Sequence, residues 1–166
     1  MTPDKSLVSP DAEFASRGET ILLVDDHPVI LEGVGEMLRR YRYSVLLASN
    51  AVEALAFWRK YRDSLQAIVS DYHLGRGRTG ISLLREINVA QPSLLTVLTT
   101  ASVTPDVMLE LERTSTIQCL PKPYHYQQLL RLLRGGLDAG PTRRLAAQRN
   151  KVDPYRPEPP SNRTER

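Results

Sequence analysis

Short apolar runs alternate along this chain with stretches whose apolar residues recur at helical spacing, and the pattern repeats five times. The runs expected to form buried strands are Thr20–Asp25, Tyr43–Ala48, Gln66–Asp71, Leu94–Thr99 and Ile117–Leu120. A helix is expected after each run. Two start signals support this: Asn50 suits an N-cap, and Thr104-Pro105-Asp106 combines a cap, a proline and an acid. The alternation predicts a doubly wound α/β fold, in which helices cover both faces of a five-stranded parallel sheet.

The two ends of the chain differ from this middle part. Residues 1–18 are rich in Ser, Pro, Asp and Glu without apolar periodicity, and residues 138–166 hold five prolines among Arg, Asn and Thr. We therefore expect a domain over residues 19–137, between a disordered N-terminal segment and a basic, Pro-rich disordered tail. An output domain such as a winged helix needs an apolar core that residues 138–166 lack. The domain is thus expected to stand alone, or to be separated from a larger chain.

Composition restricts the environment of the protein more than its function. Hydrophobic residues make up 41% and charged residues 25%, as in soluble globular proteins, and no apolar stretch reaches membrane-spanning length. The first twenty residues lack a signal-peptide pattern, and Cys119, the single cysteine, allows no internal disulfide, so we expect a cytoplasmic protein. The net charge is +3, and residues 137–166 hold seven basic and four acidic residues. Acids and prolines dilute this charge, so a solvated tail is favoured over a nucleic-acid-binding one.

Polar residues follow four of the predicted strands. They are Asp25 and Asp26 at the end of the first strand, Asp71 at the end of the third, Thr100 after the fourth and Lys122 after the fifth. In such sheets the ligand site lies at the carboxyl ends of the strands, so the fold would gather three carboxylates, a hydroxyl and an ammonium. Close carboxylates disfavour each other's ionisation, and Mg²⁺, which prefers oxygen ligands, relieves this. An aspartate in such a site can act as a nucleophile towards a phosphoryl group.

Each of these residues also has an ordinary structural interpretation. Asp25 or Asp26 could cap the first helix, and Thr100 could be a plain loop hydroxyl. Lys122 could be a surface charge, although Pro123 would fix the loop that carries it. Two adjacent acids exceed what capping needs, and the combination of all four strand ends favours a functional site.

Residues 19–136 resemble the receiver domain of bacterial response regulators, such as the chemotaxis response regulator. The resemblance lies in the order and the spacing of these polar residues at the ends of the strands in five βα units. That family has an acidic pair after strand one, an acceptor Asp ending strand three, a Thr or Ser ending strand four, and a Lys-Pro pair ending strand five. The matching residues here are Asp25-Asp26, Asp71, Thr100 and Lys122-Pro123. The resemblance implies the flavodoxin-like strand order 2-1-3-4-5.

The resemblance also implies roles for the site residues. Asp71 would accept the phosphoryl group from a sensor histidine kinase or a histidine phosphotransfer protein, with Thr100 and Lys122 contacting that group. Mg²⁺ would be held by Asp26 directly, by Asp25 through a water, by Asp71 and by the main-chain carbonyl of His73. The Lys122-Pro123 peptide bond would be cis. The domain would catalyse only its own phosphorylation and dephosphorylation, so it would not be an enzyme in the usual sense.

Two features depart from the family pattern. Cys119 stands three residues before the lysine, where most relatives carry an aromatic residue that follows the Thr during switching. The loop after Asp71 reads YHLGRGRTG, without the family's common proline. Arg76 and Arg78 of this loop could guide an anionic phosphodonor or only solvate the loop.

The leading interpretation is a phosphorylated switch that signals to a protein target through altered contacts. A homodimer could form through the face of the fourth helix, fifth strand and fifth helix, or through the first and fifth helices. A phosphate sink or shuttle in a relay is the close alternative. A metal-dependent phosphatase with an Asp nucleophile is a weaker one, because the haloacid-dehalogenase type needs Asp-x-Asp where this chain has Asp25-Asp26-His27.

Overall fold

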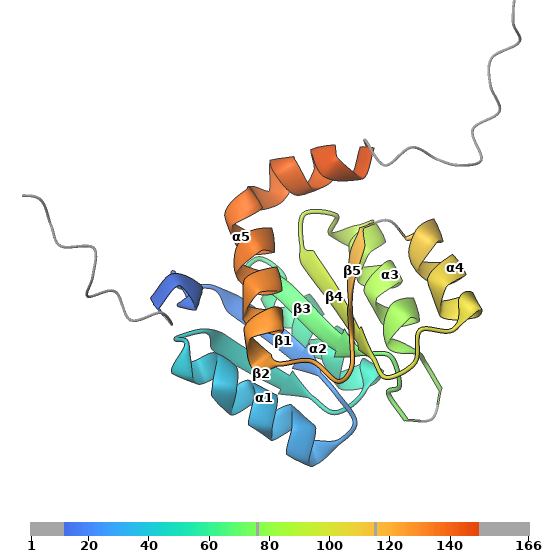
Figure 1. The fold of residues 1–166 in the computed structure, drawn as a ribbon, viewed down its shortest axis with the longest axis horizontal. Coiled ribbons are helices and arrows are strands. Elements are labelled where there is room, and N and C mark those ends of the chain that lie inside the picture. Colours follow the sequence, from blue (N-terminus) through green and yellow to red (C-terminus); the bar gives the residue numbers. More distant parts are fainter. Residues whose placement is uncertain (1–11, 76, 115, 150–166) are drawn as a thin grey trace, which may run out of the picture.

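A computed structural model describes residues 12–75, 77–114 and 116–149 of the chain. One parallel sheet lies at its centre, with helices on both faces (Figure 1). The strands are β1 (Thr20–Val24), β2 (Ser44–Ala48), β3 (Leu65–Asp71), β4 (Leu95–Thr100) and β5 (Ile117–Pro121). Their order is β2-β1-β3-β4-β5, so the predicted α/β architecture and strand order are confirmed.

The helices connect successive strands. They are α1 (Pro28–Arg40), α2 (Ala51–Tyr61), α3 (Gly80–Ala90), α4 (Pro105–Arg113) and α5 (Tyr126–Arg149), preceded by a short 3-10 helix, η2 (Ala12–Phe14). The side chains of Asn50 and Thr104 accept hydrogen bonds from the backbone amides of Glu53 and Val107, as expected of N-caps. Among the helices of the described ranges, none is long and apolar enough to cross a membrane.

The central strands β1, β3 and β4 are almost wholly buried and mostly apolar, because helices cover both faces of the sheet. Along β1, Leu22 and Val24 face a core completed by α2 and α3, whereas Ile21 and Leu23 face a second core completed by α1, α5 and η2. Helix α4 is attached more weakly. Val107 is its buried residue, while Met108 and Leu109 each keep 47% of their surface exposed.

The structure corrects the predicted domain boundaries. Residues 12–18 were expected to be disordered, yet Phe14 is buried in the second core and its carbonyl accepts a hydrogen bond from the Tyr43 hydroxyl. The domain was expected to end at residue 137, but helix α5 continues to Arg149 across a break at Gly140, where φ is 68°. Apart from Gly140, residues 138–149 are therefore helical, and the prediction of a disordered tail was wrong for them. Residues 1–11 and 150–166 lie outside the described residues.

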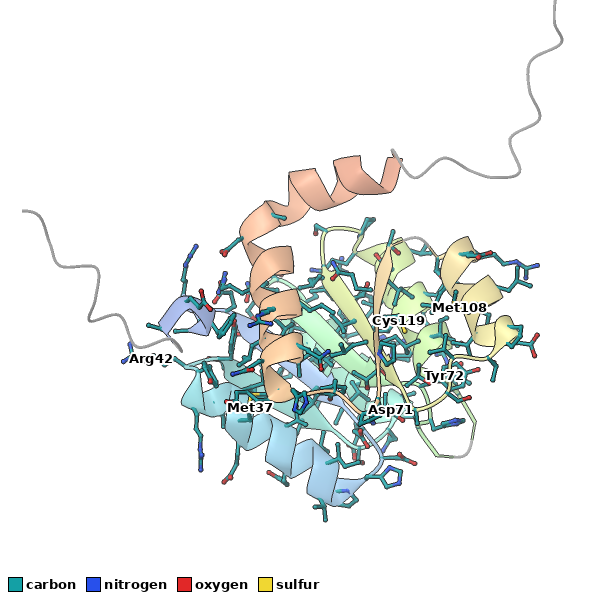
Figure 2. The ribbon with its side chains drawn as sticks, in the orientation of Figure 1. Met37, Arg42, Asp71, Tyr72, Met108 and Cys119 are labelled. Atoms are coloured by element: carbon teal, nitrogen blue, oxygen red, sulfur yellow. The ribbon has the colours of Figure 1, made fainter. Side chains whose placement is uncertain are left out.

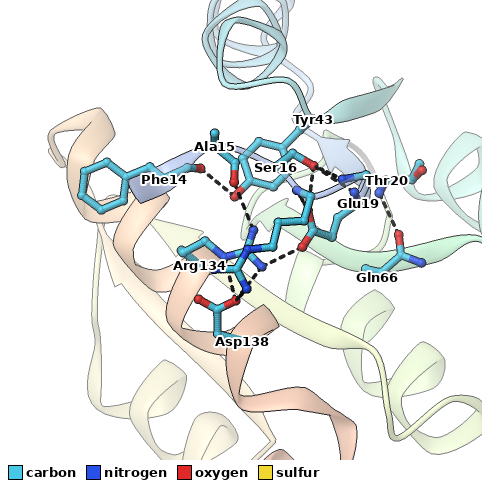
Figure 3. Close-up of polar contacts among 11 residues, drawn as sticks. Phe14, Ala15, Ser16, Glu19, Thr20, Tyr43, Gln66, Arg134 and Asp138 are labelled. Atoms are coloured by element: carbon cyan, nitrogen blue, oxygen red, sulfur yellow. Dashed lines mark hydrogen bonds and ion pairs between the residues drawn. The ribbon is translucent and has the colours of Figure 1, made fainter. Parts of the chain in front are cut away.

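A buried arginine explains why these end segments are held. Arg134 of α5 lies 2.6 Å from Glu19 and 2.9 Å from Asp138, and its guanidinium also donates to the carbonyl of Ala15 (Figure 3). Arg17 pairs with the same Asp138 oxygen at 2.9 Å. The end segments are thus attached by one buried aromatic ring and a set of ion pairs, which apolar periodicity in the sequence does not reveal.

Candidate functional site

The carboxyl ends of the central strands bring together several of the predicted residues. Asp25 follows β1 and is 4% exposed, and Asp71 ends β3 and is 7% exposed. Lys122 follows β5, and its Nζ lies 2.8 Å from Asp71 Oδ1 and 3.3 Å from Asp25 Oδ2. Burial alone would lower the pKa of the Lys122 ammonium, but its contacts with Asp71 and Asp25 outweigh burial and raise that pKa. Lys122 therefore stays charged between the two carboxylates.

Asp71 is held in place from three directions. Its Oδ1 contacts Lys122, its Oδ2 accepts a hydrogen bond of 3.0 Å from the His73 amide, and its carbonyl oxygen accepts one from the Ser70 hydroxyl. Asp71 and Tyr72 lie together at one end of the sheet (Figure 2).

Gly80, the first residue of α3, matters for this arrangement and was not among the predicted site residues. A Cβ at this position would stand 1.9 Å from the Asp71 carbonyl oxygen, so only glycine lets α3 begin against the end of β3. The Gly80 amide also donates to the Tyr72 carbonyl at 2.7 Å. A glycine directly after the N-cap Thr79 was the available signal in the sequence.

Asp26 and His27 lie beside Asp25 at the start of α1. The structure makes His27 the N-cap without a side-chain capping bond, so the suggestion that Asp25 or Asp26 caps this helix was wrong. Asp25 Oδ1 instead accepts a hydrogen bond of 2.9 Å from the His27 amide. One ligand atom from each of Asp25, Asp26 and His27 lies within 4.8 Å of the others.

The chemistry of these donors fits a divalent cation. Within the described part of the chain, Asp26 Oδ1 is buried and has no hydrogen-bond partner, although His27 Nδ1 lies 2.9 Å from it. A buried carboxylate oxygen without a donor is costly, and a cation would satisfy it. Carboxylates of Asp25, Asp26 and Asp71, all at the same end of the sheet, are the oxygen ligands that Mg²⁺ prefers.

Thr100 is buried at the end of β4, but its hydroxyl is engaged locally. Its Oγ1 donates to the Ser102 carbonyl at 2.9 Å and accepts from the Ser102 amide at 3.2 Å. The Thr100 carbonyl accepts a bond from the Lys122 amide, which ties the ends of β4 and β5 together. A phosphoryl contact by this hydroxyl stays a prediction and requires it to leave Ser102.

The remaining predicted residues divide between the site and its surroundings. The His73 ring is exposed and packs edge-on against Tyr72, and the metal-binding role of its carbonyl stays a prediction. Arg78 pairs with Glu86 at 2.6 Å, which favours a structural role over guidance of a phosphodonor. Arg76 lies outside the described residues.

Cys119 is partly buried on β5, and burial raises the pKa of its thiol. The Lys122-Pro123 bond is cis, as the resemblance implied.

Comparisons with known proteins agree on one family. The family model described as "Response regulator receiver domain" matches residues 21–134. A response regulator receiver protein of Anaeromyxobacter sp. (strain Fw109-5) is 32% identical over 111 residues, which is 67% of this chain and 45% of that protein. The two-component response regulator ORR22 of Oryza sativa is 28% identical over 78% of this chain and 18% of its own length. The chain thus spans less than half of these curated relatives.

Solved structures show the same likeness. The signal receiver domain of an HD domain-containing protein from Pseudomonas fluorescens Pf-5 is 29% identical, with a TM-score of 0.67 over 74% of this chain and 96% of that one. Chemotaxis protein CheY4 of Vibrio cholerae is 26% identical, with a TM-score of 0.63 over 71% of this chain and 98% of its own.

Proposed function

Because this chain belongs to the response regulator receiver family, we propose that Asp71 accepts a phosphoryl group from a histidine kinase or a histidine phosphotransfer protein. The observation that carries the proposal is the position of Asp71. It is a buried carboxylate at a strand end, with one oxygen 2.8 Å from a lysine ammonium and the other bonded to a backbone amide. Such a carboxylate is oriented by its two contacts as a nucleophile towards phosphorus.

The transfer follows from these contacts. An Asp71 oxygen attacks the phosphorus, a new O–P bond forms, and the bond from phosphorus to the donor's histidine nitrogen breaks, leaving its electron pair on that nitrogen. Lys122 moves its contact from the Asp71 oxygen to the phosphoryl oxygens and offsets their charge. Asp25, Asp26, Asp71 and the His73 carbonyl would hold Mg²⁺, which when bound neutralises and orients the phosphoryl oxygens.

The signal would leave the site through Thr100. Its hydroxyl exchanges the bond to Ser102 for one to the phosphoryl group, and the loop of residues 101–104 moves with it. This loop leads into α4, which is anchored mainly by Val107 and presents Met108 and Leu109 to solvent. A weakly anchored helix with an exposed apolar face can change its contacts with a protein target at small cost. The output is therefore an altered protein–protein contact.

The first experiment measures the mass of the intact protein after incubation with acetyl phosphate and Mg²⁺. Wild type should gain one phosphoryl group, and Asp71→Asn should gain none, because an amide is not a nucleophile towards phosphorus. The matched control is Asp63→Asn at an exposed position, which should label like wild type. Equal labelling of the wild type and Asp71→Asn would contradict the assignment.

The second experiment tests the output route. Amide hydrogen exchange with and without beryllofluoride, a phosphoryl mimic, should change most over residues 100–112, because the Thr100–Ser102 contact opens there. Cys119 cannot follow the threonine as a ring does, so the change should lie in the loop and helix backbone. If exchange rates changed only at the neighbours of Asp71 and stayed the same in α4, the alternative of a phosphate sink or shuttle would be favoured.

A further inference from the structure

A groove lies between the second half of α1 and the start of α5, beside η2. Its volume is about 890 Å³, and Met37, which lies next to the start of α5 in Figure 2, lines it together with Arg40 and Tyr126. Ala12, the first residue that the structure describes, lines the groove as well. We propose that residues 1–11 of the same chain occupy this groove. The site residues at the strand ends are not among the described residues that line it, so this proposal is independent of the proposed function.

The groove is open because α1 presents little bulk to it. Gly33, Met37 and Arg40 recur at intervals of four and three residues and so share one face of the helix. Within the described ranges, a Cβ at Gly33 would meet no other group within 4 Å, and Tyr126 keeps 47% of its surface exposed. The Tyr126 ring lies tilted against the Tyr41 ring, with 6.4 Å between the centroids. The described side chains therefore leave this partly apolar surface uncovered.

The place where the described chain begins favours this occupant. Phe14 is buried in the adjoining core, and the Ser16 amide donates to the Tyr41 carbonyl at 2.7 Å. These contacts hold Ala12 beside the groove, so binding of residues 1–11 there is intramolecular and benefits from a high effective concentration. The part of α1 that lines the groove is about 10 Å long, whereas eleven extended residues reach about 36 Å. The segment is therefore long enough to cover the groove.

Charge supports the match between the segment and the groove. Two arginines, Arg40 and Arg42, line the groove with a single acid, Glu36. Neither arginine side chain pairs with an acid of the described ranges. Residues 1–11 carry two aspartates and one lysine, the opposite set of charges. The aspartates can supply the partners that the two arginines lack, and the lysine can pair with the glutamate.

Apolar contacts would hold the middle of the segment. Leu7 and Val8 are adjacent near its centre, and Met37 and Tyr126 offer them apolar surface in the groove. Burying aliphatic side chains against this surface removes apolar area of both partners from water. The docked segment would also cover the exposed part of Tyr126 and close this face of α1 and α5 to other proteins.

The test is a measurement of backbone motion by NMR relaxation on the full chain. In the wild type, the amides of Leu7 and Val8 should be as rigid as the domain, with an order parameter of about 0.85, whereas a free segment lies below about 0.6. Gly33→Trp fills the groove and should release the segment, because there is space for a side chain at position 33. Glu32→Trp adds the same ring at a neighbouring exposed position of α1 that is not among the residues lining the groove, and should leave the segment rigid.

A charge reversal supplies a second readout. Arg40→Glu should release the segment, and Arg39→Glu, at the adjacent exposed position outside the groove lining, should not. If Leu7 and Val8 move freely in the wild type, or stay rigid in both Gly33→Trp and Arg40→Glu, the proposal is overturned. Rigidity that is lost on dilution of the wild type would place the segment in the groove of a second copy, and would overturn docking within one chain.

Discussion

The molecule holds two clusters in which one cation lies between two carboxylates, at opposite ends of the sheet. At the end of the sheet where β1 finishes, Lys122 lies between Asp25 and Asp71. At the end where β1 begins, Arg134 lies between Glu19 and Asp138 (Figure 3). The residue types are almost the same, yet we assign reactivity to the first cluster and stability to the second. The difference lies in how many carboxylate oxygens in and beside each cluster lack a hydrogen-bond partner.

The arginine cluster is saturated. The Arg134 guanidinium donates to Glu19, to Asp138 and to a backbone carbonyl, and Glu19 also accepts bonds from the Ser16 hydroxyl and the Arg17 amide. A planar fork of donors filled in this way fixes its neighbours. In the lysine cluster a mobile point charge contacts one oxygen of each carboxylate, and the amides of His27 and His73 donate to the other two. The neighbouring Asp26 Oδ1 has no hydrogen-bond partner in the described ranges, although His27 Nδ1 lies 2.9 Å from it. This one oxygen is available for a cation.

The largest expected effect comes from removing the arginine. Arg134→Met leaves the Glu19 carboxylate, whose side chain is 14% exposed, without its cation, and should lower the free energy of unfolding by about 3 kcal/mol. Labelling of Asp71 in the folded variant should stay at the wild-type level, because the two clusters share no residue. Urea unfolding and intact-mass measurement check both statements.

The control for this variant is Arg85→Met, which removes an exposed arginine of α3 and should cost less than about 0.5 kcal/mol. If Arg134→Met cost no more than this control, the arginine cluster would be a surface ion pair, and the proposed contrast between the clusters would be lost.

A smaller effect is expected from acid. Burial alone would raise the pKa of Glu19, but hydrogen bonds from Arg134, Ser16 and the Arg17 amide outweigh burial and lower it from 4.5 to about 2. A carboxyl whose folded-state pKa is lowered stabilises the fold above its unfolded pKa, and this contribution is lost as the pH falls from about 4.5 towards 2. With allowance for solvent screening, the loss should be on the order of 2 kcal/mol.

The comparison of Glu19→Gln with wild type isolates this contribution, since other carboxyl groups titrate in the same pH window. The stability difference between the two proteins should shrink between pH 5 and about pH 2. Glu32→Gln, at an exposed position of α1, should follow the wild-type curve. A constant difference between Glu19→Gln and wild type across this window would show that Glu19 is not titrating against Arg134.

The contrast between the clusters also explains what the sequence could predict. Asp25 and Asp71 each end a predicted strand and Lys122 follows one closely, and the fold class alone places the ends of parallel strands at one edge. Glu19, Arg134 and Asp138 carry no such marker. Glu19 and Arg134 are separated by 115 positions, and Asp138 fell in a segment assigned to the tail. The local bond from Thr100 to Ser102 was equally unpredictable, because it depends on a hydroxyl rotation rather than on a residue pattern.

The smallest expected effect concerns the lysine itself, and it tests whether the reactive cluster is as open as its unsatisfied atoms suggest. Lys122 occupies the space between Asp25 and Asp71, so a divalent cation that binds these carboxylates must displace its ammonium or share their charge with it. Lys122→Met should therefore raise the Mg²⁺ affinity several-fold, about 1 kcal/mol, even though it should slow labelling by removing a contact to the phosphoryl oxygens.

Calorimetry with Mg²⁺ measures this affinity, and Lys60→Met, which removes an exposed lysine of α2, corrects for the change in net charge. If Lys122→Met bound Mg²⁺ more weakly than Lys60→Met, Lys122 would be holding the carboxylates in place for the metal. The lysine cluster would then be preorganised like the arginine cluster, and the difference between the two would lie in access rather than in unsatisfied atoms. An increase in affinity would instead show that the lysine competes for this charge, so that metal binding frees its ammonium for the phosphoryl group.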